Sequence, residues 1–121
     1  MSAAAEDRAT TLNYALLLWS TVRALRRRTA AGASVWRAWI ETLDDLEVVD
    51  DGERLCRDLY ACFPAGPSLG QLIYEDGCGT LDRGRLANVL AFADARARER
   101  VAALSPSAVC DVRHPTPPDQ T

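Results

Sequence analysis

The sequence predicts an all-α fold, a compact bundle of about five helices, on the strength of three observations. Apolar residues recur at helical spacing along most of the 121 residues. Capping residues, glycines and prolines interrupt that spacing at intervals that suit short helices. No segment alternates apolar and polar residues over the length of a strand. We therefore expect one helical domain over residues 10–104, between a flexible N-terminus at 1–9 and a Pro-rich, flexible tail at 105–121.

The first predicted helix starts at Thr10 or Thr11, either of which can act as its N-cap. Leu17 and Leu18 widen the apolar face of this helix, so we expect the helix to be buried on more than one side. Because a bundle this small leaves apolar surface uncovered, we expect Leu17 and Leu18 to form a homodimer interface. The last turns carry arginines that complement the helix dipole, and the same cluster would also suit an acidic partner: Arg23, Arg26, Arg27 and Arg28.

The second predicted helix runs from a cap at Ser34 through Val49. Trp36 and Trp39 lie on its apolar stripe, one turn apart. Tryptophan is common both in cores and in binding hot spots, so core packing and contact with a partner are both open at these positions.

Two further short helices follow. Asp50 and Glu53 have the spacing of a capping box, which predicts a third helix ending at Phe63. Ser68 then caps a fourth helix over 69–74. The loop after it contains two glycines that suit positive φ angles.

The last predicted helix has the clearest pattern. Thr80 or Asp82 caps it, and Ser105 followed by Pro106 ends it. Its stripe keeps helical spacing throughout and is expected to face the core: Leu86, Val89, Leu90, Ala93, Ala97, Val101 and Leu104.

The residue inventory argues against catalysis. His114 is the only histidine and falls in the predicted tail, so no catalytic residue is assigned. The four cysteines lack the spacing of metal ligands, and no metal or cofactor is expected. The glycine-containing loop matches neither a Walker loop nor a dinucleotide-binding motif. We therefore expect a protein that is not an enzyme.

The net charge and the hydropathy of the sequence limit the expected cellular location and the expected classes of partner. The net charge of −3 argues against nucleic acid, which requires a clustered basic surface. No apolar run is long enough for a membrane anchor, and the N-terminus lacks the features of a signal peptide. The cysteine spacing also indicates reduced thiols. A cytosolic or nuclear protein that binds other proteins is the expectation.

Several segments resemble the Bcl-2-like proteins of poxviruses. The run at 14–19, YALLLW, is similar to the apolar opening helix of that family, which ends in tryptophan. The run at 43–52, LDDLEVVDDG, resembles its acidic junction, and 67–72, PSLGQL, resembles a helix start. The alanine- and charge-rich run at 95–100 occupies a similar place. This resemblance implies a Bcl-2-like bundle in the host cytoplasm that binds host proteins of the apoptotic or NF-κB pathway.

A second similarity concerns the first homology motif of cellular Bcl-2 proteins. Asp76-Gly77, then Gly84-Arg85, then Ala91-Phe92 follow the order of that motif, although extra residues separate the three pairs. The resemblance implies that the last helix is the central one. It also implies a partner groove between the second and last helices, with five tentative lining residues: Trp36, Trp39, Gly84, Arg85 and Val89.

The chain departs from that family at its C-terminus. A Pro-rich tail stands where the Bcl-2 fold has two more helices, so the fold is expected to be abbreviated or completed by a partner subunit. The leading hypothesis is a viral inhibitor of apoptosis or NF-κB activation that acts by binding host signalling proteins. The alternative is a helical scaffold or regulatory module from a GC-rich bacterium.

Overall fold

The computed structural model describes residues 3–63 and 66–107, which form five α-helices and one 3-10 helix with no strand. The predicted all-α fold class is thus confirmed. The elements in chain order are α1 (Ala3–Ala30), α2 (Val35–Asp45), η1 (Val49–Asp51), α3 (Gly52–Tyr60), α4 (Leu69–Gly77) and α5 (Arg83–Leu104). None of these helices is both long and apolar enough to cross a membrane.

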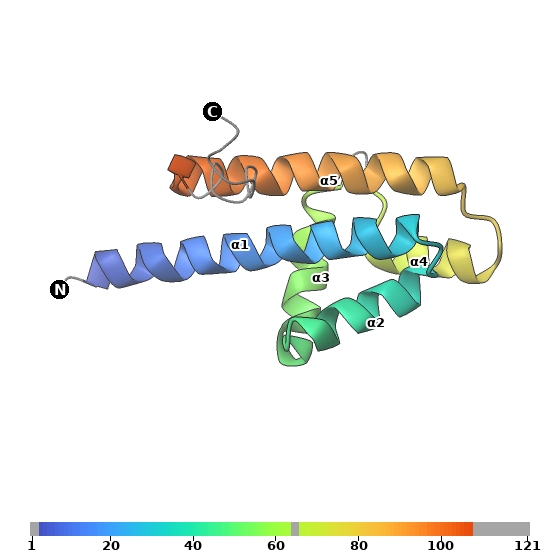
Figure 1. Ribbon diagram of the computed structural model, residues 1–121, viewed down its shortest axis with the longest axis horizontal. Coiled ribbons are helices and arrows are strands. Elements are labelled where there is room, and N and C mark those ends of the chain that lie inside the picture. Colours follow the sequence, from blue (N-terminus) through green and yellow to red (C-terminus); the bar gives the residue numbers. More distant parts are fainter. Residues whose placement is uncertain (1–2, 64–65, 108–121) are drawn as a thin grey trace, which may run out of the picture.

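Helix α1 is the element around which the others are arranged. It lies antiparallel to α5 along the long axis of the molecule, with α2 on its opposite side (Figure 1). It contacts α2, α3 and α5, whereas α5 packs mainly on α1. The expectation that the last helix is the central one therefore differs from the structure, because α1 takes that position.

Three of the predicted helix caps are present. The Ser34 hydroxyl accepts a hydrogen bond from the backbone N–H of Arg37, at 3.2 Å, and begins α2. Ser68 begins α4 in the same way. At α5 the cap is Asp82, whose carboxylate accepts bonds from two backbone N–H groups, at 2.8 and 3.2 Å. These signals were predictable because each involves only a few neighbouring residues.

Other boundaries differ from the prediction. Helix α1 begins at Ala3, so the flexible N-terminus predicted at 1–9 is wrong from that residue onward. Helix α4 continues to Gly77, three residues beyond its predicted end. Helix α3 follows η1 and has no side-chain cap, so the Asp50–Glu53 capping box is not formed. The tail predicted from residue 105 lies outside the described residues from 108 onward.

The end of α2 has a clear physical cause. The helix was predicted to continue through Val49 but ends at Asp45, because Glu47 adopts a positive φ of 56°. The backbone N–H of Val48 then reaches back to the Leu43 carbonyl at 2.9 Å, and that of Glu47 to the Asp44 carbonyl at 3.1 Å. This pair of bonds is a Schellman motif, which satisfies carbonyls that the helix itself leaves free.

One apolar core lies between α1, α5 and the three shorter helices. Every residue of the stripe predicted on α5 is buried except Leu104, which is 43 % exposed. Leu18, Val22 and Leu25 of α1 face this stripe from within the same cluster.

Four helix ends are tied together at one end of the molecule. Asp76, near the end of α4, accepts a hydrogen bond from the first N–H of α2, at Val35, with an N–O distance of 2.6 Å. The first residue of α5, Arg83, donates to the carbonyls of Thr29 and Ala33, each at 3.1 Å. Arg83 also pairs with Asp76 at 3.4 Å. These contacts fix the orientation of α2 and of the α1–α5 pair relative to one another.

Candidate functional site

The outward face of α2 carries an exposed apolar pair. Trp36 is 56 % exposed and Ile40, one turn later, is 43 % exposed. Arg37 and Glu41 lie beside them, with their charged groups 3.8 Å apart. We refer to Trp36 and Ile40 as the α2 outer face. Exposed apolar side chains with polar neighbours are typical of surfaces that bind proteins.

Trp39 has the opposite environment from Trp36. It is only 6 % exposed and belongs to the core with Val35 and Leu43. The predicted groove contains both tryptophans, but the structure separates them. Trp39 is a core residue, and Trp36 alone is accessible to a partner.

The other predicted groove residues meet on α5. Gly84, Arg85 and Val89 line a surface hollow of about 520 Å³ together with Asp82, Asn88 and Phe92. Phe92 is 46 % exposed and Val89 is 6 % exposed. The guanidinium of Arg85 lies 3.0 Å from the carboxylate of Glu75, so this arginine already has an internal partner.

The predicted groove between α2 and α5 is not formed by the described residues. Helix α1 lies between these two helices (Figure 1), and each of them packs against α1. The outer face of α2 and the hollow on α5 are therefore separate surfaces. The spacing of residues along each helix carries no information on which helices become neighbours, so this error came from the resemblance.

The predicted homodimer residues also have different environments. Leu18 is 1 % exposed and belongs to the monomer's core, so it is not available to a second subunit. Leu17 is half-buried against the same core. An interface centred on both residues is therefore wrong for Leu18, and the homodimer itself stays a prediction.

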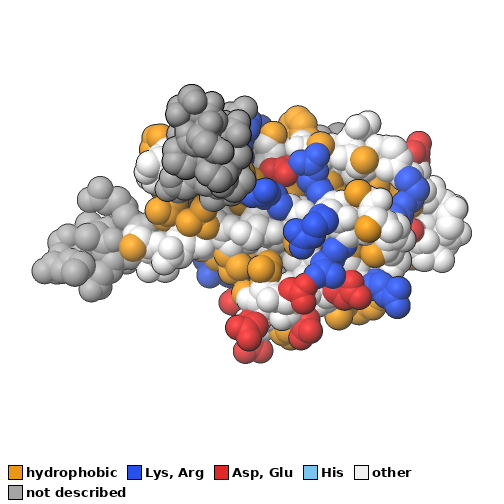
Figure 2. All heavy atoms as spheres, in the orientation of Figure 1, with side chains coloured by type: hydrophobic (Ala, Val, Ile, Leu, Met, Phe, Trp, Pro, Cys, Tyr) orange, Lys and Arg blue, Asp and Glu red, His pale blue; other side chains and the backbone are white. Residues whose placement is uncertain are grey.

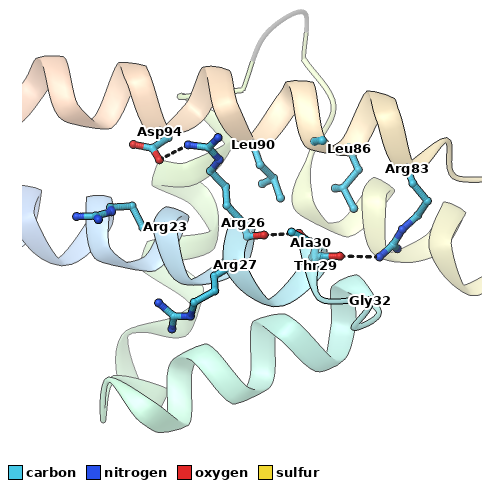
Figure 3. Close-up of a pocket in the computed structure, with 11 residues that line it drawn as sticks. Arg23, Arg26, Arg27, Thr29, Ala30, Gly32, Arg83, Leu86, Leu90 and Asp94 are labelled. Carbon is cyan, nitrogen blue, oxygen red and sulfur yellow. Dashed lines mark hydrogen bonds and ion pairs between the residues drawn. The ribbon is translucent and has the colours of Figure 1, made fainter. Parts of the chain in front are cut away.

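A second hollow, of about 570 Å³, lies between α1 and α5 (Figure 3). The residues that line it come from the last turns of α1, the turn that follows it, and the first half of α5: Arg23, Arg26, Arg27, Thr29, Ala30, Gly32, Arg83, Leu86, Ala87, Leu90 and Asp94. We call it the arginine hollow. The sequence indicated an arginine cluster here, but it did not indicate that the cluster borders a concave surface.

Two arginines near the end of α1 have acidic partners on other helices. Arg26 donates to Asp94 of α5 at 2.6 Å, and the same carboxylate accepts from the indole N–H of Trp19, also at 2.6 Å. Arg28 pairs with Glu41 at 2.9 Å and with Asp45, linking α1 to α2. Two members of the cluster thus hold neighbouring helices, in addition to their interaction with the helix dipole.

Charge is unevenly distributed over the face that contains this hollow. Figure 2 shows Arg side chains in a band across α1, while acidic side chains gather near the turn between α2 and α3. The acidic group is made of exposed residues: Asp44, Asp45, Glu47, Asp50 and Asp51.

The described residues show no arrangement that points to metal binding. Within 3–63 and 66–107, no three or more His, Cys, Asp or Glu residues are grouped so that they could hold an ion. Burial raises the pKa of the Cys56 and Cys62 thiols, which disfavours the nucleophilic thiolate form. His114 lies outside the described residues.

Comparison of the chain with protein-family models, with curated proteins and with solved structures finds no match.

Proposed function

We propose that this protein is a Bcl-2-like protein of the poxvirus type that binds a host signalling protein through the α2 outer face and thereby inhibits NF-κB activation. The observation that carries the proposal is the exposure of Trp36 beside Ile40 on a helix whose other face is buried. The sequence resemblance supplies the class of partner.

The chemistry of the α2 outer face suits a protein partner. An exposed tryptophan offers a large apolar area with one hydrogen-bond donor, and such residues dominate binding energies in protein interfaces. The neighbouring Arg37 and Glu41 supply charges of both signs at its edge. A partner with an apolar pocket and a polar rim would complement this surface.

Helix α2 is held in place before any partner arrives. Asp76 accepts a hydrogen bond from its first N–H, and Arg28 pairs with Glu41 and Asp45 on its last two turns. A surface that needs no reordering loses less conformational entropy on binding. The contacts that hold α2 in place therefore favour its use as a docking surface.

Two observations favour the NF-κB branch over the apoptotic branch. A helical peptide from a pro-apoptotic protein would need a groove, and α1 separates the two helices expected to form one. Arg85, the residue expected to meet the acidic group of such a peptide, is paired with Glu75. A surface outside a groove is the remaining route to a host partner.

An NF-κB reporter assay in transfected human cells tests the proposal. Wild type should suppress the reporter, and Trp36→Ala should lose most of that suppression, because a hot-spot tryptophan contributes more than about 2 kcal/mol to binding. The matched control is Tyr74→Ala on α4, which removes an aromatic ring that is 71 % exposed. Circular dichroism verifies that both variants fold. Absence of suppression by the wild type, or equal suppression by both variants, would contradict the proposal.

Titration with helical peptides from pro-apoptotic proteins tests the choice of branch. We expect no binding to the wild type, because Arg85 and the α2 outer face do not share a groove. Micromolar binding that weakens about tenfold in Arg85→Ala, equivalent to about 1.4 kcal/mol, would instead support the apoptotic branch.

A further inference from the structure

The arginine hollow contains positive charge that the described residues do not neutralise. Four of its lining residues are arginines, and Asp94 is the only acidic residue among the described side chains that line it. Asp94 neutralises Arg26, and Arg83 is engaged by Asp76 and by two backbone carbonyls. Within the described part of the chain, Arg23 and Arg27 have no carboxylate partner, and both are exposed. These two guanidinium groups are therefore available to an anion.

Their spacing argues that this charge is functional. Arg23 and Arg27 are four residues apart on α1, which brings them to the same face about 6 Å apart along the axis. Like charges at this spacing are mildly destabilising, and no described acidic side chain offsets the repulsion. An anion bound between them would remove it.

Asp94 shows the kind of group that this surface accepts. One of its carboxylate oxygens accepts from Arg26 and the other from the indole N–H of Trp19, both at 2.6 Å. Arg23 lies over the ring of the same tryptophan, 5.6 Å from its centroid. A carboxylate thus already occupies one end of the hollow, near Arg23. Figure 3 shows Arg26 reaching from α1 to Asp94 on α5.

The lining of the hollow is partly apolar. Ala30 and Ala87 are exposed there, whereas Leu86 and Leu90 are buried core residues. An inorganic anion would leave the two alanines in contact with water. A peptide that carries an apolar side chain next to its carboxylates would cover the alanines and contact the arginines together.

We propose that the arginine hollow binds an acidic peptide segment of a partner protein, with its carboxylates on Arg23 and Arg27 and an apolar side chain over Ala30 and Ala87. This site is separate from the α2 outer face and does not depend on it. Duplex nucleic acid fits less well, because the exposed acidic residues near the α2–α3 turn would repel an extended phosphate backbone (Figure 2).

Fluorescence anisotropy with a defined probe tests this proposal. The probe is a short labelled peptide of glutamates and leucines in an alanine background. Its affinity should fall at least about tenfold in the double variant Arg23→Gln/Arg27→Gln, and binding should weaken with added salt. The matched control is Arg57→Gln, which removes the same charge from a 73 % exposed position on α3. Its affinity should remain within about twofold of wild type.

Further binding measurements test whether the carboxylates of the peptide and each of the two arginines are required. A peptide with glutamine in place of glutamate should not bind, because it lacks the carboxylates. The proposal is overturned if the wild type does not bind the acidic peptide, or if the double variant binds that peptide as tightly as the wild type does. It is equally overturned if the wild type binds the glutamine peptide as tightly as the glutamate peptide. It is also overturned if inorganic pyrophosphate or duplex DNA binds at Arg23 and Arg27 while the peptide does not. Arg27→Gln alone, which leaves the Arg23–Trp19 contact intact, should give an intermediate affinity.

Discussion

Asp94 links the two longest helices because each of its carboxylate oxygens accepts a different donor from α1. Its side chain is 16 % exposed and Trp19 is 4 % exposed, so water has little access to the indole N–H. A buried donor that loses its acceptor bears the full cost of desolvation. This single side chain therefore matters more to stability than an ordinary surface carboxylate.

Asp94→Ala should lower the free energy of unfolding by about 1–3 kcal/mol, because it leaves the Trp19 N–H unpaired. Urea denaturation followed by circular dichroism measures the change. Glu99→Ala, at an exposed position on the same helix, is the control and should change stability by less than about 0.5 kcal/mol. Equal effects of the two substitutions would show that the Asp94 contacts contribute little.

Tyr14 gives the protein a defined response to alkaline pH. Burial raises its pKa to about 12, and the hydrogen bond that it donates to Asp58, together with the charge of that carboxylate, acts in the same direction. The folded state thus retains the phenol proton more strongly than the unfolded state, whose pKa is about 10. The resulting stability is present below about pH 10 and is lost as the pH rises through about 12.

The free energy of unfolding should consequently fall more steeply between about pH 10 and pH 12 in the wild type than in Tyr14→Phe, which cannot ionise. Chemical denaturation across this range measures both slopes. Parallel curves for the two proteins would contradict the assignment.

At the scale of the helix, the predictions that succeeded rest on local signals. Ser34, Ser68 and Asp82 cap their helices through backbone groups two or three residues away, so short sequence windows contain the whole interaction. The end of α2 could not be predicted in this way, because Glu47 occupies a left-handed conformation that usually favours glycine or asparagine. The two tryptophans of α2 illustrate the same limit, since a position on the stripe does not decide how far each ring is covered.

The buried apolar stripe of α5 packs against α1, and a substitution in the stripe tests this packing. Leu90 is 2 % exposed and faces α1, so Leu90→Ala should lower the free energy of unfolding by about 2–5 kcal/mol by creating a cavity. Asn88→Ala, at an exposed position on the same helix, is the control and should have a small effect. Thermal and urea denaturation measure both. An unchanged stability in Leu90→Ala would mean that α5 does not pack as described.

At the scale of the molecule, the arrangement of helices separates surfaces that the resemblance placed together. Because α1 lies between α2 and α5, Trp36 belongs to one surface and Gly84, Arg85 and Val89 to another. The arginine hollow lies between α1 and α5 and depends on both helices. Neither result follows from the sequence of a single helix, since each depends on which elements become neighbours.

Site-specific photocrosslinking tests whether a host protein docks on the α2 outer face. A photoreactive phenylalanine analogue replaces Ile40 in protein expressed in human cells, and crosslinked partners are identified by mass spectrometry. A control places the same analogue at Arg57 of α3. We expect a component of the NF-κB pathway to be crosslinked from position 40 and not from position 57. Crosslinking of such a component from position 57 alone, or from neither position while the protein still inhibits the pathway, would contradict this expectation.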